Sequence, residues 1–232
     1  QVGLRLWSDY SQIGIYGSAY KIVAVLAIFQ SIFSSFWAPV ALRWYKENAP
    51  VEHYSYMGEL TMSLMSLVMV LLFISRNLIV LLLGVEYRSA VSVFPTLCMV
   101  PVLYTVSEVT GAGISFSRKT WWMVASSSVA VGVNLLLIYI LIPKYGAVGA
   151  SFATGISYIF FFGVKTYASQ RVWARFRVFP YLINIGMLLF INMTSFLGIG
   201  QLMQHSAILV LVCWDLVSAY SSIKKIRYIA HE

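Results

Sequence analysis

Four ionisable side chains lie inside stretches of sequence that otherwise carry almost no charge: Lys21, Arg76, Glu108 and Asp215. Ionisable groups inside a bilayer are costly, so each of them is a candidate for a functional role. Lys21 comes about one turn into its apolar stretch. There it could face a cavity and bind an anion such as a phosphate, or it could extend to the outer headgroups. Position alone leaves both interpretations open.

The other three residues carry different alternatives. Arg76 follows 16 uncharged residues, and it either lines an outward vestibule as a second substrate-binding cation or anchors a helix end, which is the simpler interpretation. Glu108 could carry a proton or coordinate Na⁺, or it could form a structural hydrogen bond with a neighbouring Ser, Thr or Tyr. Asp215 could pair with a Lys or Arg from another helix, and this structural role is a simpler interpretation than a role in transport.

The apolar stretches that hold these residues have the length of membrane-spanning helices. About 20 residues of helix cross the roughly 30 Å of hydrocarbon in a bilayer. The runs are continuous rather than alternating, which favours helices over barrel strands. The sequence therefore predicts an all-α polytopic transmembrane helical bundle with about seven spans. The expected spans cover residues 18–40, 60–83, 89–115, 120–143, 145–164, 178–198 and 204–222.

Composition supports a membrane protein and argues against an enzyme. Of the 232 residues, 60% are hydrophobic and 10% are charged, and the mean hydropathy is +0.81, which is unlike a soluble domain. No polar segment is long enough for a catalytic domain. The two cysteines, Cys98 and Cys213, lie inside expected spans, and Cys and His do not cluster. We therefore expect no metal site and no cofactor.

The net charge of +8 is best explained by membrane topology rather than by nucleic-acid binding. When the loops are assigned alternately to two sides, one side holds 11 basic residues and the other holds 5. The richer side should be cytoplasmic, and the carboxyl terminus with it. That side contains Arg43, Lys46, Arg118, Lys119, Lys165, Arg171, Arg175, Arg177, Lys224, Lys225 and Arg227. The other contains Arg5, Lys21, Arg76, Arg88 and Lys144.

Small residues, prolines and aromatics predict how the helices pack. Residues 143–155 indicate a tight outer loop followed by a helix with small residues four apart, which lets backbones approach closely. Pro95 and Pro101 predict a kink in the third span, since each removes a backbone donor. Aromatic residues near the span ends are typical of interfacial belts. They include Trp37, Trp44, Tyr45, Trp121, Trp122, Trp173, Tyr220 and Tyr228.

Three motifs together resemble a known family. The segment 14–21 (GIYGSAYK) resembles the opening of the eighth helix in polysaccharide flippases. Residues 143–154 (PKYGAVGASFAT) are similar to the entry to their twelfth helix, and residues 83–87 (LGVEY) to the loop after their ninth. The order and spacing of these motifs resemble the multidrug/oligosaccharidyl-lipid/polysaccharide exporter superfamily, most closely its O-antigen and capsule repeat-unit flippases.

The resemblance implies two six-helix lobes around a central cavity that opens alternately to each side of the bacterial cytoplasmic (inner) membrane. Residues 1–171 would form the carboxyl-terminal lobe with its first helix largely missing, and residues 172–232 two additional helices with a cytoplasmic tail. The chain begins without Met, and Gln1–Trp7 looks like the tail of an apolar segment, as expected for part of a longer protein. Lys21 matches the position of a cavity-facing arginine in the related lipid II flippases.

The function implied is the flipping of undecaprenyl-pyrophosphate-linked oligosaccharides for O-antigen, lipopolysaccharide or capsule biosynthesis. The implied partners are that lipid-linked substrate, membrane lipids, a polysaccharide polymerase with its assembly proteins, and an amino-terminal lobe. One alternative is a cation-coupled multidrug exporter of the same superfamily. Others are a membrane-embedded glycosyl or acyl transferase, which would need clustered polar residues, and a scaffold that does not transport.

Overall fold

The computed structural model describes residues 9–81, 85–198 and 201–229, and no strand occurs among them. Five of the helices are long and apolar enough to cross a membrane. The fold is therefore an all-α polytopic membrane helical bundle, as predicted. These five are α2 (Tyr10–Lys46), α3 (Val51–Ile74), α8 (Trp121–Val172), α9 (Phe179–Leu197) and α10 (Gln201–Ile229).

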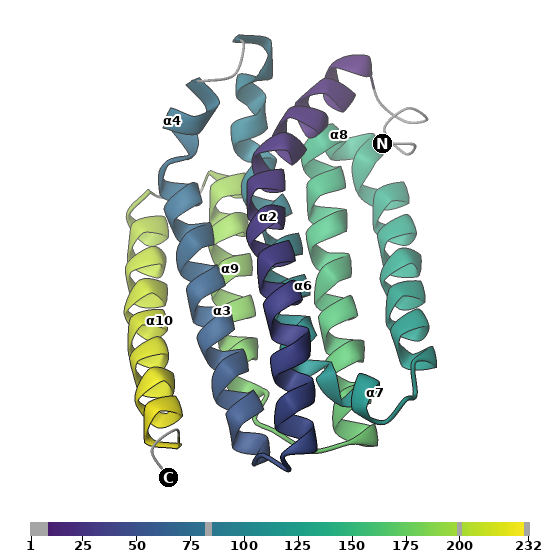
Figure 1. The fold of residues 1–232 in the computed structure, drawn as a ribbon. Helices are drawn as coiled ribbons and strands as arrows, with labels where there is room; N and C mark the ends of the chain where they lie inside the picture. Colours follow the sequence, from purple (N-terminus) through teal and green to yellow (C-terminus); the bar gives the residue numbers. More distant parts are fainter. Residues whose placement is uncertain (1–8, 82–84, 199–200, 230–232) are drawn as a thin grey trace.

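Helix α8 is two antiparallel helices joined by a sharp turn. As one straight helix its 52 residues would extend about 78 Å, far beyond the hydrocarbon core. Gly146 has φ 53° and ψ −128°, a backbone conformation that residues with a side chain rarely adopt. The chain reverses there, and the two halves run side by side (Figure 1). This turn confirms the tight loop and the separate fourth and fifth spans expected from the sequence.

The small residues after the turn let the two halves of α8 touch. A Cβ atom added to Gly149 would lie 2.5 Å from the carbonyl oxygen of Leu141 in the first half. One added to Gly155 would lie 3.2 Å from the Thr96 side chain of a different helix. The predicted role of this segment in close helix packing is therefore confirmed.

The third expected span is broken into short helical pieces: η1 (Val85–Ser92), α5 (Phe94–Leu97), α6 (Met99–Thr110) and α7 (Ala112–Phe116). The break between α5 and α6 falls at Cys98. Pro101 follows it and has no N–H to donate to the carbonyl of Leu97. The helix is therefore interrupted between the two prolines, where the sequence predicts a kink.

Several helix boundaries differ from those expected. Helix α2 begins before residue 18, and α3 runs from Val51 to Ile74 rather than over 60–83. A separate short helix, α4 (Arg76–Leu81), follows. Hydropathy marks the part of a helix that lies in lipid, whereas the hydrogen-bonded helix continues through polar flanks. Residues 1–7 and the first two positions of the 83–87 motif lie outside the described residues.

Helix α6 lies at the centre and packs against α2, α3 and α8. Its Val102, Leu103 and Val106 side chains are fully buried. Helix α10 packs along α3 and α9, on the opposite side of the bundle from the α8 hairpin (Figure 1). Buried polar side chains occur both between α6 and α8, as at Thr110 and Lys165, and between α3, α9 and α10, as at Ser63, Asn184 and Asp215.

Trp37 does not belong to an interfacial belt, in contrast to the expectation. It is 2% exposed and packs edge-to-face on Trp44 and Tyr54, and Tyr54 packs in the same way on Trp173. The Trp37 Nε1–H group donates to the carbonyl oxygen of Glu108 at 3.1 Å. Proximity to a helix end did not predict this burial, because Tyr54 of α3 and the Glu108 carbonyl of α6 reach Trp37 from other helices.

Candidate functional site

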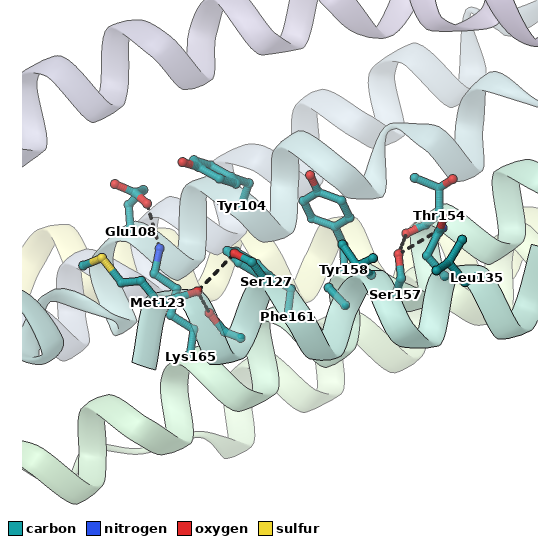
Figure 2. A pocket seen from close by; sticks show the side chains of 14 residues that line it. Tyr104, Glu108, Met123, Ser127, Leu135, Thr154, Ser157, Tyr158, Phe161 and Lys165 are labelled. Carbon is teal, nitrogen blue, oxygen red and sulfur yellow. Dashed lines mark hydrogen bonds and ion pairs between the residues drawn. The ribbon is translucent and has the colours of Figure 1, made fainter. Parts of the chain in front are cut away.

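A cavity of about 600 Å³ lies between α6 and the two halves of α8 (Figure 2). Its lining combines an ion pair, aromatic rings, and small hydroxyl and amide side chains. Such a mixture suits a ligand with charged, flat and hydrogen-bonding parts. The lining residues are Tyr104, Glu108, Met123, Ser126, Ser127, Ala130, Val131, Asn134, Leu135, Thr154, Ser157, Tyr158, Phe161 and Lys165.

An ion pair between Lys165 and Glu108 marks one part of this cavity. The Lys165 Nζ lies 2.8 Å from the Glu108 Oε1 and donates to Ser107 Oγ at 3.3 Å. Figure 2 shows the ammonium group directed at the carboxylate. The Lys165 side chain is 8% exposed and that of Glu108 is 27% exposed. The carboxylate is thus the more accessible partner, and the ammonium depends on it to offset burial.

Both residues were interpreted differently from sequence. The sequence predicts a cytoplasmic loop at Lys165, because the hydropathy run ends at residue 164. In the structure α8 continues to Val172, which keeps Lys165 inside the bundle. Of the two interpretations of Glu108, the structural one names a Ser, Thr or Tyr as partner, whereas the structure places a lysine there. The ion-coupling role stays a prediction.

Aromatic rings and a glycine make the space for Lys165. Its Nζ lies 5.4 Å from the centre of the Tyr104 ring and 5.3 Å from that of Phe161, within the range of a cation–π interaction. These two rings stack on each other at 5.9 Å. A Cβ atom on Gly111 would lie 2.7 Å from Lys165 Cε. The ammonium is therefore held in a defined position rather than free to extend to the membrane surface.

A signal for this site was present in the sequence. Thr154, Tyr158, Phe161 and Lys165 follow at intervals of four, three and four residues, which places them on one face of a helix. Tyr104 and Glu108 are likewise four apart on α6. The pattern could have suggested a shared polar face, although it could not have shown that the two faces meet.

Helix α2 reaches the other end of the cavity. The Tyr16 hydroxyl lies 3.3 Å from Thr154 Oγ1, and the Tyr16 ring stacks on Tyr20. Lys21 follows Tyr20 on α2 and is exposed. It is not among the residues that line the cavity. Its role as a substrate-binding cation stays a prediction.

Arg76 lies away from this cavity. Its Nη1 donates to Ser195 Oγ of α9 at 2.6 Å, and its guanidinium carbon lies 4.3 Å from the centre of the Phe73 ring. These contacts tie the start of α4 to the end of α9, which is how an anchor behaves. A substrate-binding role for Arg76 stays a prediction.

The sequence suggests a cationic partner for Asp215, but the structure shows no ion pair for it among the described residues. The ion pairs found among the described residues are Lys165 with Glu108 and the exposed pair Arg43 with Glu47. At the depth of Asp215, the helices packed against α10 present uncharged Ser63 and Asn184. A charge in one helix therefore did not identify its partner, because register between helices decides which side chains meet.

One curated protein resembles this chain over a large part of its length. The "Probable low-salt glycan biosynthesis flippase Agl15" of Haloferax volcanii is 24% identical over 159 residues, which are 67% of this chain and 34% of the relative. This chain thus spans about a third of the relative's length. No family model matches the sequence, and no solved structure matches it.

The likeness agrees with the expectation that the chain is not an enzyme, since the relative is named as a flippase. It does not extend to a superfamily assignment or to O-antigen substrates. Together with the five long apolar helices, it identifies the chain as a multi-pass α-helical membrane protein with a distant likeness to a glycan biosynthesis flippase.

Proposed function

We propose that this chain is one lobe of a flippase for lipid-linked oligosaccharides, and that the cavity between α6 and α8 forms part of the substrate path. The observation that carries the proposal is Lys165, a buried cation held against Glu108 at 2.8 Å in an aromatic-lined cavity. The likeness to a glycan biosynthesis flippase supports the same substrate class.

The cavity offers a separate kind of contact to each part of such a substrate. Lys165 supplies a positive charge for a phosphate group. Tyr104, Tyr158 and Phe161 present rings on which the apolar faces of sugars stack. The hydroxyl and amide groups of Ser127 and Asn134 suit the hydroxyls of a sugar.

In this proposal, the Glu108 carboxylate occupies the position beside Lys165 that the phosphate takes when the substrate binds. It is more exposed than Lys165, so it can swing away when a stronger anion arrives, while Lys165 stays fixed by its aromatic neighbours. The released carboxylate is then free to bind a proton or Na⁺, which would couple ion binding to substrate binding. The possible ion-coupling role of Glu108 thus remains part of the proposal.

The wider organisation is also proposed. Residues 1–171 would form the carboxyl-terminal lobe, whose cavity faces an amino-terminal lobe, and residues 172–232 would add two helices and a cytoplasmic tail. Rocking of the lobes would expose an undecaprenyl-pyrophosphate-linked substrate first to the inner and then to the outer leaflet. The setting would be a bacterial inner membrane, with a polymerase and assembly proteins using the product for O-antigen or capsule.

Deletion of the gene in its host tests the proposal. We expect loss of surface polysaccharide and accumulation of lipid-linked repeat units at the inner leaflet, both reversed when the gene is restored. Polysaccharide gels and extraction of lipid-linked sugars measure the two effects. Intact polysaccharide in the deletion strain would contradict the proposal.

A multidrug exporter is the second candidate, because the carboxylate is the more exposed member of the ion pair and lies near aromatic rings that could bind a cationic drug. The same deletion strain separates the two functions. Sensitivity to cationic drugs with normal polysaccharide would support the exporter.

Lys21 provides a further prediction. We expect Lys21→Ala to reduce surface polysaccharide and Lys21→Arg to retain it, because both Lys and Arg supply a positive charge to a phosphate. Lys46 is exposed at the end of the same helix, so Lys46→Ala is a matched control for loss of charge. Normal polysaccharide with Lys21→Ala would rule out the proposed cavity cation.

A further inference from the structure

A fully buried carboxylate lies on the other side of the bundle from the cavity. Asp215, in the middle of α10, is 0% exposed. Neither of its oxygen atoms has a hydrogen-bond partner, although Ser63 of α3 and Asn184 of α9 face it. A carboxylate in this position is a functional candidate rather than an ordinary packing residue.

No positive charge is available to neutralise Asp215 within the part of the chain that the structure describes. It takes part in neither of the two ion pairs found there. Residues 60–74 of α3 and all of α9 contain no Lys, Arg, Asp or Glu. An ionised carboxylate without a partner in hydrocarbon is very costly, and binding a proton removes that cost.

The neighbours of Asp215 suit a protonated carboxyl group. Asn184 donates its Nδ2 to the carbonyl of Pro180, at 3.4 Å, which leaves its Oδ1 without a partner. Ser63 Oγ is also buried and without a partner. The Asn184 Oδ1 atom is an acceptor and the Ser63 hydroxyl can donate or accept, so a carboxyl O–H has an acceptor on each of these two helices. These two side chains can therefore accommodate a carboxyl O–H, and the burial of Asp215 without a cation is what favours that form over a free carboxylate.

Polar side chains lead from Asp215 toward the end of the bundle where the sequence predicts the cytoplasm. On α3, Ser55, Glu59 and Ser63 follow at four-residue intervals and so lie on one face. On α10, Ser222 lies two turns beyond Asp215, is buried, and has no hydrogen-bond partner. Two antiparallel helices thus carry polar groups along the interface where they pack.

Glu59 connects these polar side chains of α3 and α10 to a pocket at the end of the bundle. It lines a pocket of about 330 Å³ together with Ser55, Arg175 and Arg177. The charges that act on Glu59 are those of Lys225 and Arg177, and the Ser222 and Ser55 side chains face it. A proton in this pocket therefore has a carboxylate to receive it and hydroxyl groups leading inward.

We propose that Asp215 is a proton-binding site, loaded from the Glu59 pocket through Ser222 and Ser63. In loading, a hydronium ion in the pocket gives up one proton and becomes water, and the Asp215 carboxylate gains a proton, so one O–H bond breaks and one forms. Loading neutralises the only charged residue of α10 between Gln201 and Lys224, so it changes how tightly α10 packs on α3 and α9. This proposal does not depend on the substrate of the cavity between α6 and α8.

Infrared spectroscopy of the full chain in lipid vesicles tests the site directly. A protonated carboxyl group has a carbonyl band that an ionised one lacks. We expect a band that persists at neutral pH, is lost in Asp215→Asn, and remains in Glu52→Gln, which removes an exposed carboxylate of α3. A band unchanged by Asp215→Asn would overturn the proposal.

Two further variants and a sodium titration complete the test. Ser63→Ala keeps the carboxyl group and should shift the band by removing an acceptor, so it serves if Asp215→Asn does not fold. Glu59→Gln should slow the deuterium shift of the band in D₂O, and equal rates would overturn the route. Asp215 could instead stay ionised, with a thermal stability that rises with Na⁺ only when Asp215 is present. That result would overturn the proton site and show that the site binds Na⁺.

Discussion

Replacing Lys165 with methionine should lower the rate of flipping by about 10- to 100-fold, because a charged hydrogen bond contributes roughly 1.5–3 kcal/mol. Methionine keeps much of the side-chain length and apolar character and removes only the charge. Surface polysaccharide in the complemented deletion strain measures the effect, with the protein level in the membrane measured alongside. Lys165→Arg keeps a cation and should retain more activity than the methionine variant.

A double variant separates substrate binding from simple ion-pair loss. Lys165→Met alone leaves Glu108 half-buried without its partner, which is itself destabilising. Adding Glu108→Gln removes that unpaired charge and should restore the protein level. If Lys165 binds the phosphate, flipping stays low in the double variant. Recovery of flipping together with stability would show that the pair is only structural.

Replacing Gly149 with valine should lower the free energy of unfolding by about 1–3 kcal/mol, the usual cost of overfilling a tight contact. The added Cβ would lie 2.5 Å from the Leu141 carbonyl oxygen, which is backbone and cannot rotate away. The two halves of α8 must therefore separate. The midpoint of thermal unfolding in detergent measures the change.

Gly163→Val provides the matched control for this packing prediction. Gly163 lies on the same half of α8, and a Cβ atom there would meet nothing within 4 Å. We expect its unfolding midpoint to remain close to that of the parent chain. Equal losses in both variants would mean that valine itself disturbs the helix, and the argument from close contact would fail.

The membrane helices were predictable because their signal is local. A hydrocarbon environment requires about 20 apolar residues in every crossing, so hydropathy alone identified the segments. Backbone chemistry is local as well. The turn at Gly146 and the break before Pro101 followed from a glycine-containing loop and from a residue without an N–H group. Helix ends were less predictable, since α3 ends at Ile74 within an apolar run.

The candidate site was only half predictable. Glu108 was identified because a carboxylate in an apolar stretch is conspicuous, whereas Lys165 was missed because it follows directly after one. Their meeting at 2.8 Å joins positions 57 residues apart, and no local pattern encodes that register. The same limitation explains Asp215, for which the sequence predicts a cationic partner, whereas uncharged Ser63 and Asn184 face it in the structure.

By itself, the sequence determined that this protein crosses the membrane as a helical bundle and where the chain must turn. Those properties follow from the cost of leaving peptide groups unpaired in lipid and from the backbone restrictions of Gly and Pro. Only the tertiary structure decided which polar groups share a site. The fold of the α8 hairpin against α6 places Lys165 beside Glu108, and the packing of α10 leaves Asp215 without a cation.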